Sequence, residues 1–287
     1  MVVTYYLVIY ICLIVDIWIE DFMYQFGTIL GLFSMAFIYN FLSLAIVYRT
    51  MEEVELILKG GKKMKDKYNL TREQNVFITK RNIVDYIWKS ANLEGIGVTY
   101  PETQTIYDGG VVNGLTVDKI IAINNLKYAW QFILENEDIE YDYNALCHIH
   151  KLVADKLVLD QELGKIRTTP VNIGGTKWKP QFPIESQIKE ELKSLLNQPE
   201  KTKTEIAIEI MLSVMRRQMF IDGNKRVAML FANKIMIDNG CGIITIAQDN
   251  QETFYEKLIK YYESGDMSDL KQWIYDYCID GIDLNHN

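Results

Sequence analysis

The stretch QMFIDGNKRVA, residues 218–228, joins two segments of the chain whose apolar residues recur with helical spacing. The first segment covers residues 206–215, and the second covers residues 227–237 and ends at Asn239 and Gly240, which form a helix stop. The polar residues between them predict a short loop that opens the second helix.

This loop places an acid, a glycine, an asparagine, a lysine and an arginine side by side, in residues 222–226. Backbone N–H groups at a helix start have no intrahelical acceptor, and the helix dipole favours anions there. Such a loop can hold a metal ion and phosphates. The alternative is an ordinary turn between helices with an Asn-Gly cap and solvated charges, because short motifs give false positives.

The same residues resemble the signature of the Fic/Doc family, H-x-F-x-[DE]-G-N-[GK]-R. Five of them match it as they stand: Phe220, Asp222, Gly223, Asn224 and Arg226. Lys225 matches the Doc-like variant of the signature. Gln218 stands where the family has its catalytic histidine, and Met229 stands where the family has a second arginine. The resemblance covers most of the chain, from about residue 65 to about residue 277.

The resemblance implies transfer of AMP from ATP to a hydroxyl of a protein target, or transfer of phosphate as in Doc-like members, which also suggests a toxin–antitoxin setting. It makes Asp222 the Mg²⁺ ligand. It assigns the nucleotide to Gly223, Asn224, Lys225 and Arg226. The catalytic positions are then Gln218, Asp222 and Arg226.

Gln218 weakens the prediction of catalysis. The family histidine takes the proton of the target hydroxyl, whereas an amide cannot act as a general base. Three outcomes follow: a slow transferase, a transferase that uses another base such as Asp222 or a substrate phosphate, or a non-catalytic regulatory module that binds a nucleotide or a protein.

A second motif lies near the end of a predicted helix and consists of Ser90, Glu94 and Gly95. On its own it fits an ordinary helix C-terminus followed by glycine. It also resembles the inhibitory motif of the family, [ST]-x-x-x-E-[GN], whose glutamate blocks productive ATP binding and pairs with the second arginine. Because Met229 replaces that arginine, we expect Glu94 to contact Lys225 or Arg226.

Residues 164–183 interrupt the helical rhythm. Val171 and Ile173 are typical of a strand, Gly174 and Gly175 predict a turn, and Trp178 begins a return, so we expect a β-hairpin. The alternative is a plain connector. By resemblance the segment is the flap that docks a target protein by strand addition. Its docking residues would be Pro170, Val171, Asn172, Ile173 and Gly174.

Composition limits the class of protein and the functions to be considered. The chain has 287 residues, 49% hydrophobic and 24% charged, which is typical of a globular protein, and its net charge of −8 argues against a dedicated nucleic-acid binder. The four cysteines have no metal or disulfide spacing, which indicates a reducing compartment. His148 and His150 lie about 200° apart around a predicted helix, so they cannot share a metal and we expect structural or surface roles.

The first fifty residues differ from the rest. Residues 27–47 contain no charge and are long enough to span a bilayer. Basic residues follow at Arg49, Lys59, Lys62, Lys63, Lys65 and Lys67. This order places the C-terminal side in the cytoplasm. The alternatives are a buried hydrophobic hairpin and an extension upstream of the true start, at Met51 or Met64.

We therefore predict an all-α Fic-like helical domain with a β-hairpin flap and an N-terminal helical arm, preceded by N-terminal transmembrane helices if the hydrophobic segment is an anchor. The expected divisions are a hydrophobic segment (1–50), a basic linker (51–67), an inhibitory arm (68–100) that opens with a capping box at Thr71 and Gln74, and the Fic domain (101–287). Residues 100–114, which are rich in glycine, are expected to form a loop.

The predicted function is a Fic-type transferase that is autoinhibited by Glu94 and impaired by Gln218. The alternative is an inactive nucleotide- or protein-binding module. The expected cofactors are ATP and Mg²⁺, and the expected partner is a protein target along the flap. The Fic domain is expected in the cytoplasm, with membrane contact through residues 27–47. The sequence leaves open whether the chain is a monomer or a homodimer, and which protein is the target.

Overall fold

The computed structural model describes Ser43 and residues 64–283, and the predicted membrane segment 27–47 lies outside them except for Ser43. Within the described part, no helix has both the length and the apolar character that crossing a membrane requires. The chain separates into two compact units, residues 1–63 and residues 64–287. The second unit contains the predicted arm and the predicted Fic domain, whose narrower boundaries remain predictions.

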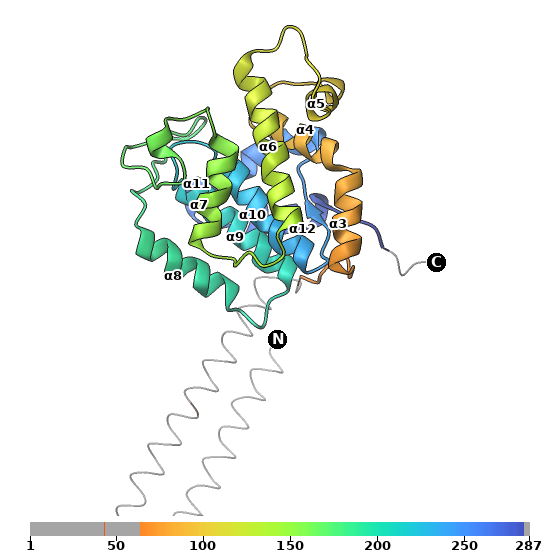
Figure 1. Cartoon of the computed structure of the whole chain (residues 1–287). Helices are drawn as coiled ribbons and strands as arrows, with labels where there is room; N and C mark the ends of the chain where they lie inside the picture. Colours follow the sequence, from red (N-terminus) through yellow and green to blue (C-terminus); the bar gives the residue numbers. More distant parts are fainter. Residues whose placement is uncertain (1–42, 44–63, 284–287) are drawn as a thin grey trace, which may run out of the picture. The chain divides into compact units, whose positions relative to one another are not determined.

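Two antiparallel neighbours, α9 (Lys203–Arg217) and α10 (Asn224–Asp238), form the centre of this unit (Figure 1). Most residues of α9 and nearly all residues of α10 are buried. The side chain of Thr202 accepts a hydrogen bond from the N–H of Glu205 and fixes the start of α9. The predicted loop between the two helices is therefore confirmed, and it lies at the end of the most buried helix pair.

The predicted stop of α10 is also confirmed, since the helix ends before Asn239 and Gly240 has a φ of 66°. The carbonyl oxygen of Gly240 accepts a hydrogen bond of 3.0 Å from the N–H of Leu70. A Cβ atom at Gly240 would lie 1.8 Å from the carbonyl oxygen of Leu70. Glycine is therefore required here by both its backbone conformation and its close approach to the start of the arm.

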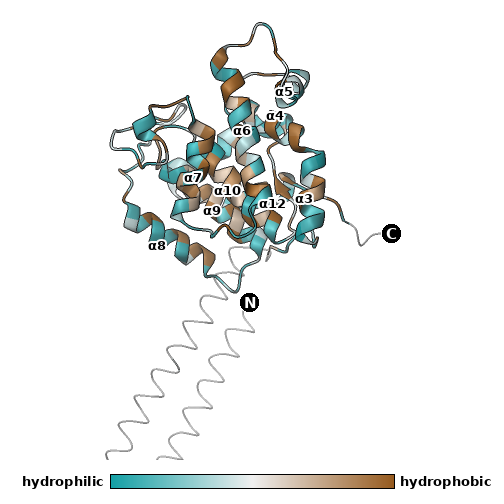
Figure 2. Cartoon of the chain, viewed as in Figure 1, coloured by the Kyte–Doolittle hydropathy of each residue, from teal (hydrophilic) through white to brown (hydrophobic). Residues whose placement is uncertain are grey.

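Amphipathic helices surround the central pair: α6 (Val117–Glu135), α7 (Tyr143–Ala154), α8 (Glu185–Leu196), α11 (Gln251–Ser264) and α12 (Ser268–Tyr277). On α8 only Ile188 and Leu192 are buried, and Figure 2 shows hydrophilic and hydrophobic residues alternating along this helix. Short 3₁₀ turns, η1 (Asp160–Glu162) and η2 (Gln248–Asn250), follow α7 and precede α11.

The predicted arm consists of α3 (Arg72–Arg81) and α4 (Ile83–Leu93), with a break at Asn82. Thr71 and Gln74 form the expected capping box. The buried face of α4 belongs to the same hydrophobic core as α6, α9 and α10. The arm is therefore an integral layer of the unit, and the end of α4 places Glu94 near the loop between α9 and α10.

Residues 100–114 do not form the expected loop throughout, because α5 (Tyr100–Tyr107) occupies the first half. Thr99 and Glu102 form a capping box, and Pro101 lies in the first turn, where its missing N–H costs nothing. The loop prediction was wrong for residues 100–107, because it gave more weight to Pro101 and the following glycines than to this signal for a helix start.

The described residues contain one sheet, of two short antiparallel strands, β1 (Ile243–Ile244) and β2 (Ile279–Asp280). Ile243 pairs with Asp280 and Ile244 pairs with Ile279. The predicted turn at Gly174–Gly175 is present, but its two flanks do not pair as strands. Three prolines in residues 164–183 have no N–H to donate to a neighbouring strand. The guanidinium of Arg167 donates hydrogen bonds to one carbonyl of each flank, so these carbonyls do not pair with each other's strand.

Candidate functional site

The signature loop, residues 218–224, begins and ends in the left-handed region of the backbone. Gln218 ends α9 with φ 46° and ψ 52°, and Gly223 precedes α10 with φ 77° and ψ 6°. A residue other than glycine in this region costs about 1 kcal/mol. The side chain of Gln218 offsets this cost, because its Nε2 donates to the carbonyl of Met215 at 2.7 Å and its Oε1 accepts from Nδ2 of Asn224 at 3.2 Å.

Asn224 closes the loop from inside. Its Oδ1 accepts the N–H of Phe220 at 2.9 Å, and its Nδ2 donates to the carbonyl of Phe220 at 2.9 Å. Both ends of the buried amide are used within the loop. Asn224, predicted to bind the nucleotide, thus shapes the loop in this structure, and the backbone N–H at the helix start is the part of the residue left for a ligand.

His150 on α7 supports the loop from behind. Its ring stacks on Phe220 with a centroid distance of 3.9 Å and an interplanar angle of 7°. Nδ1 accepts the N–H of Gly164 at 2.9 Å, and Nε2 lies 3.2 Å from the carbonyl oxygen of Asp222, so these partners favour the tautomer protonated on Nε2. Burial lowers the pKa of His150 to about 4 and keeps the ring neutral.

The expected structural role of His150 is present, but its position behind the signature loop was missed. One signal existed in the sequence. His150 follows Leu146 by four residues and precedes Val153 by three, so it shares the apolar face of its helix. Both of these neighbours are buried.

Arg226 holds the acid of the loop. Its Nη2 lies 2.8 Å from Oδ2 of Asp222, and its Nη1 donates to the carbonyl of Val153 at 3.0 Å. The guanidinium is buried, whereas the side chain of Asp222 is 56% exposed. Arg226 therefore fixes the carboxylate and the end of α7, and this geometry does not present it as a free phosphate clamp.

Lys225 is the neighbour of Glu94. Oε2 of Glu94 lies 3.6 Å from Nζ of Lys225, and the two side chains are 13% and 24% exposed. The ammonium group also lies 5.6 Å from the ring centroid of Tyr255, whose hydroxyl donates to the carbonyl of Leu93. Burial and the charge of Glu94 raise the pKa of Tyr255 to about 12. Of the two cations expected to meet Glu94, the structure selects Lys225.

The rest of the second motif positions this contact. The backbone N–H of Glu94 donates to the carbonyl of Ser90, and Gly95 follows with a φ of 71°. Oε1 of Glu94 is buried and has no hydrogen-bond partner among the described residues. A carboxylate oxygen left in this state is unfavourable unless the nearby cation compensates for it.

Arg167 ties the flap, residues 164–183, to the signature loop. Its Nε donates to the carbonyl of Gln218 at 2.7 Å, and its backbone N–H donates to the carbonyl of Met219 at 2.9 Å. The side chain is fully buried although it carries a charge. Sequence reasoning missed this residue, because nothing near it in the chain indicates a partner fifty residues away.

The predicted docking residues lie on the first arm of the flap. Pro170, Asn172 and Gly174 are exposed, while Val171 and Ile173 are half-buried. In the described ranges no hydrogen bond joins residues 170–174 to the signature loop. Beyond the turn, Trp178 stacks on Tyr262 of α11 at a centroid distance of 5.4 Å. The structure therefore brings the base of the flap to the loop and its far arm onto α11.

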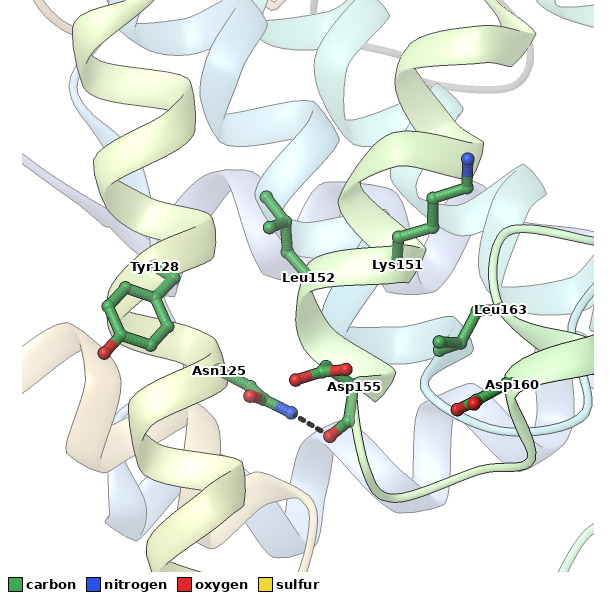
Figure 3. Close-up of a pocket in the computed structure, with 7 residues that line it drawn as sticks. All are labelled: Asn125, Tyr128, Lys151, Leu152, Asp155, Asp160 and Leu163. Atoms are coloured by element: carbon green, nitrogen blue, oxygen red, sulfur yellow. Dashed lines mark hydrogen bonds between the residues drawn. The ribbon is translucent and has the colours of Figure 1, made fainter.

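A hollow of about 560 Å³ lies between α6 and α7 (Figure 3). It is lined by Asn125, Tyr128, Lys151, Leu152, Asp155, Asp160 and Leu163. None of the predicted site residues lines it. Asn125 donates to the carbonyls of Val153 and Asp155, at 3.4 Å and 2.8 Å, and so fixes the turn of α7 to which Arg226 is bound.

Two of three comparisons with known proteins found a match. The model of the Fic/DOC family matches residues 140–236. None of the curated proteins compared with the chain matches its sequence.

Solved structures with a similar fold include Fic-1 from C. elegans, residues 134–508, at 19% identity and a TM-score of 0.59, which covers 82% of this chain and 70% of that one. A Fic family protein from Desulfovibrio desulfuricans has 20% identity and a TM-score of 0.60, with 81% and 71% covered. A Fic domain containing signaling protein from Bacteroides thetaiotaomicron has 14% identity and a TM-score of 0.60, with 72% and 85% covered.

The predicted resemblance is confirmed by these comparisons, and the matched region contains α7, the flap, the signature loop and nearly all of α10. The mostly helical architecture is that of the similar Fic structures. Residues 140–236 of this chain thus match the Fic/DOC family, and the helical fold around them is similar to that of solved Fic structures.

Proposed function

We propose that the chain is a Fic-type transferase that moves AMP, or phosphate, from ATP to a hydroxyl of a protein target and is restrained by Glu94. The observation that carries the proposal is the open start of α10. Gly223 offers no side-chain cap, and among the described residues the backbone N–H groups of residues 224–226 have no acceptor. Three donors at a helix start, beside the ammonium group of Lys225, form a site for phosphate.

The residues present fit ATP and Mg²⁺. Mg²⁺ is usually held by one or two carboxylates together with substrate phosphates. Asp222 supplies one exposed carboxylate at the loop, and no group of three ligating side chains occurs in the part of the chain that the structure describes. When bound, the nucleotide supplies the transferred group and Mg²⁺ neutralises phosphate charge.

The proton of the target hydroxyl limits the rate. The amide of Gln218 cannot accept it, and the amide is already engaged with Met215 and Asn224. Asp222 is the only carboxylate of the loop, and holding the metal competes with service as a base. Loss of a general base typically costs about 10²–10⁴-fold in rate, so we propose slow transfer.

The engaged amide of Gln218 also favours a second function, a module that binds a nucleotide or a protein without transfer. The two functions differ in the fate of the nucleotide. The full chain, incubated with a cell lysate and with ATP labelled at the α or at the γ position in parallel reactions, distinguishes them.

Protein label from the α position means AMP transfer, and label from the γ position alone means phosphate transfer. Asp222→Asn is the control that should abolish either signal. No label from either position, with ATP still bound, contradicts the transferase and supports the binding module.

A further inference from the structure

We infer that the flap selects acidic targets, and that a cleft beside it, at Arg216, receives a carboxylate side chain of the target segment. The inference rests on the proposed function, because it names the class of target that the same site would modify. It does not concern the nucleotide, so it can be tested without transfer.

The charge of the flap is opposite to that of the whole chain. The net charge of the chain is −8, yet residues 164–183 contain no aspartate or glutamate. The same residues contain four basic side chains: Lys165, Arg167, Lys177 and Lys179. Arg167 is buried within the flap, whereas the three lysines are exposed. An acidic segment approaching this protein is therefore repelled by most of the molecule and attracted to the flap.

The cleft lies between the far arm of the flap, α8, the last turn of α9 and α11. It has a volume of about 330 Å³. Its walls include the aromatic side chains of Trp178, Phe182 and Tyr261, and its polar groups include Glu191, Arg216 and Arg217. A space of this size accepts one side chain with its first hydration shell.

Arg216 is held in place but retains a free donor. Its guanidinium lies 4.8 Å from the ring centroid of Trp178 and 5.8 Å from that of Tyr261. Nε and Nη2 donate to the carbonyl of Tyr262 at 3.3 Å and 3.1 Å. Within residues 64–283, Nη1 donates to no acceptor and no carboxylate pairs with Arg216. A guanidinium fixed in this way loses little entropy when it binds a carboxylate.

The other charges of the cleft cancel each other. Glu191 accepts a hydrogen bond from Nε of Arg217 at 2.6 Å, and its second oxygen accepts from the hydroxyl of Ser213. Arg216 is therefore the charge of the cleft that no carboxylate of the described residues neutralises. A carboxylate that enters the cleft can pair with it without displacing an existing ion pair.

The cleft adjoins the signature loop. Arg216 precedes Gln218 by two residues, and Tyr262 lies between the cleft and the loop, stacked on Trp178 and 3.5 Å from Nε2 of Gln218. A segment that lies along the flap and presents a hydroxyl at the loop therefore brings a neighbouring side chain to the cleft. Alternate residues of an extended segment point to the same side, which suits one hydroxyl and one nearby acid.

Peptide binding tests this inference with the full chain and no nucleotide. The probe is a fluorescein-labelled peptide in which each threonine lies two residues from a glutamate, with glycine between them, and its matched control has glutamine at each glutamate. Fluorescence anisotropy should show that the acidic peptide binds about tenfold more tightly than the control, as one charge-assisted hydrogen bond gives. Added salt should reduce this preference.

Two sets of variants locate the preference. Arg216→Gln should remove most of the preference for the acidic peptide. The double variant Lys177→Gln, Lys179→Gln, at two exposed positions, should remove the smaller part that the flap lysines contribute. Lys80→Gln, which removes an exposed charge from α3, should change neither affinity. Equal binding of the two peptides to the parent overturns the inference, and a preference that is undiminished in Arg216→Gln overturns the role of the cleft.

The outcome is separable from that of the proposed function. Selective binding of the acidic peptide without any transfer to protein leaves this inference standing and removes the transferase. Transfer to proteins together with equal binding of the two peptides leaves the transferase standing and removes this inference.

Discussion

At the scale of single residues, two side chains set the chemistry of the loop. Gln218 replaces the basic group that the family signature carries, and Lys225 takes the contact with Glu94 that Met229 cannot make. The departure at Met229 was visible in the sequence, and it correctly limited the partner of Glu94 to a cation of the loop. The choice between Lys225 and Arg226 was not predictable, because it depends on Arg226 being occupied by Asp222 and Val153.

Gln218→His should raise the rate of transfer to protein by about 10²-fold or more, because it restores a general base where the rest of the loop is intact. The measurement is the initial rate of label incorporation from ATP. Gln218→Asn, which changes the side chain without adding a base, should stay at the parent rate. If the histidine variant binds ATP and remains as slow as the parent, the missing base is not the cause of slow transfer, and Lys225 is the next residue to test.

Glu94→Gln should tighten ATP binding several-fold or more, because it frees the ammonium group of Lys225 for phosphate. An exposed ion pair is worth at most about 1 kcal/mol and a desolvated one more, and the partial burial of this pair puts it between these cases. The measurement is the dissociation constant for ATP.

Asp85→Asn is the matched control for this change. It removes one negative charge from α4, the helix that ends just before Glu94, and Asp85 there pairs with Lys89. Equal ATP affinities of the parent, Glu94→Gln and Asp85→Asn would mean that the second motif only ends a helix.

At the scale of elements, local signals were sufficient where capping and periodicity agreed. The helices on both sides of the loop and the capping box at Thr71 follow from such signals. The flap does not follow from such signals: Val171 and Ile173 have strand character, but Arg167 binds the carbonyls of Thr169 and Gln181 at the base of the two flanks. A side chain that replaces the hydrogen bonds of a strand ladder leaves no trace in the spacing of apolar residues.

The support of the loop by α7 predicts a dependence of stability on pH. The pKa of His150 falls from 6.5 to about 4 on folding. Between pH 6.5 and pH 4, the unfolded chain therefore binds a proton at His150 that the folded chain does not bind. The contribution is fully present above the unfolded pKa of 6.5 and is lost as pH falls toward 4. The shift corresponds to about 3 kcal/mol in the free energy of unfolding.

Denaturant unfolding of the parent and of His150→Gln at pH values from about 7 to about 4.5 measures this dependence. The parent should lose stability more steeply than His150→Gln, which has no ring to protonate. His148→Gln, at an exposed position of the same helix, should follow the parent. Parallel curves for the parent and His150→Gln would contradict the role of the buried ring.

At the scale of the whole molecule, buried ionic groups join elements that are distant in the sequence. Glu209 on α9 is buried and accepts hydrogen bonds from Nζ of Lys201 and of Lys271, each at 2.8 Å. The all-α class and the central helix pair were predictable from periodicity and from the family signature. The pair of Glu209 with Lys271 was not predictable, because partners more than sixty residues apart leave no local pattern.

Glu209→Ala should lower the free energy of unfolding by about 2 kcal/mol, because it leaves the partly buried ammonium group of Lys201 without a carboxylate and leaves Lys271 with Glu205 alone. Chemical denaturation at neutral pH measures the loss. Glu256→Ala, on the exposed face of α11, is the matched control and should change stability by less than about 0.5 kcal/mol. A similar small change in both variants would show that α9 and α12 are held by their apolar contacts alone.

The central claim is that the start of α10, with Asp222 and Lys225, is a site for ATP and Mg²⁺. Calorimetric titration of the full chain with ATP, with and without Mg²⁺, tests it most directly. We expect binding that requires Mg²⁺ in the parent, that is lost in Asp222→Asn and that is weakened in Lys225→Gln. ATP binding that is independent of the metal and unchanged in Asp222→Asn would contradict the assignment.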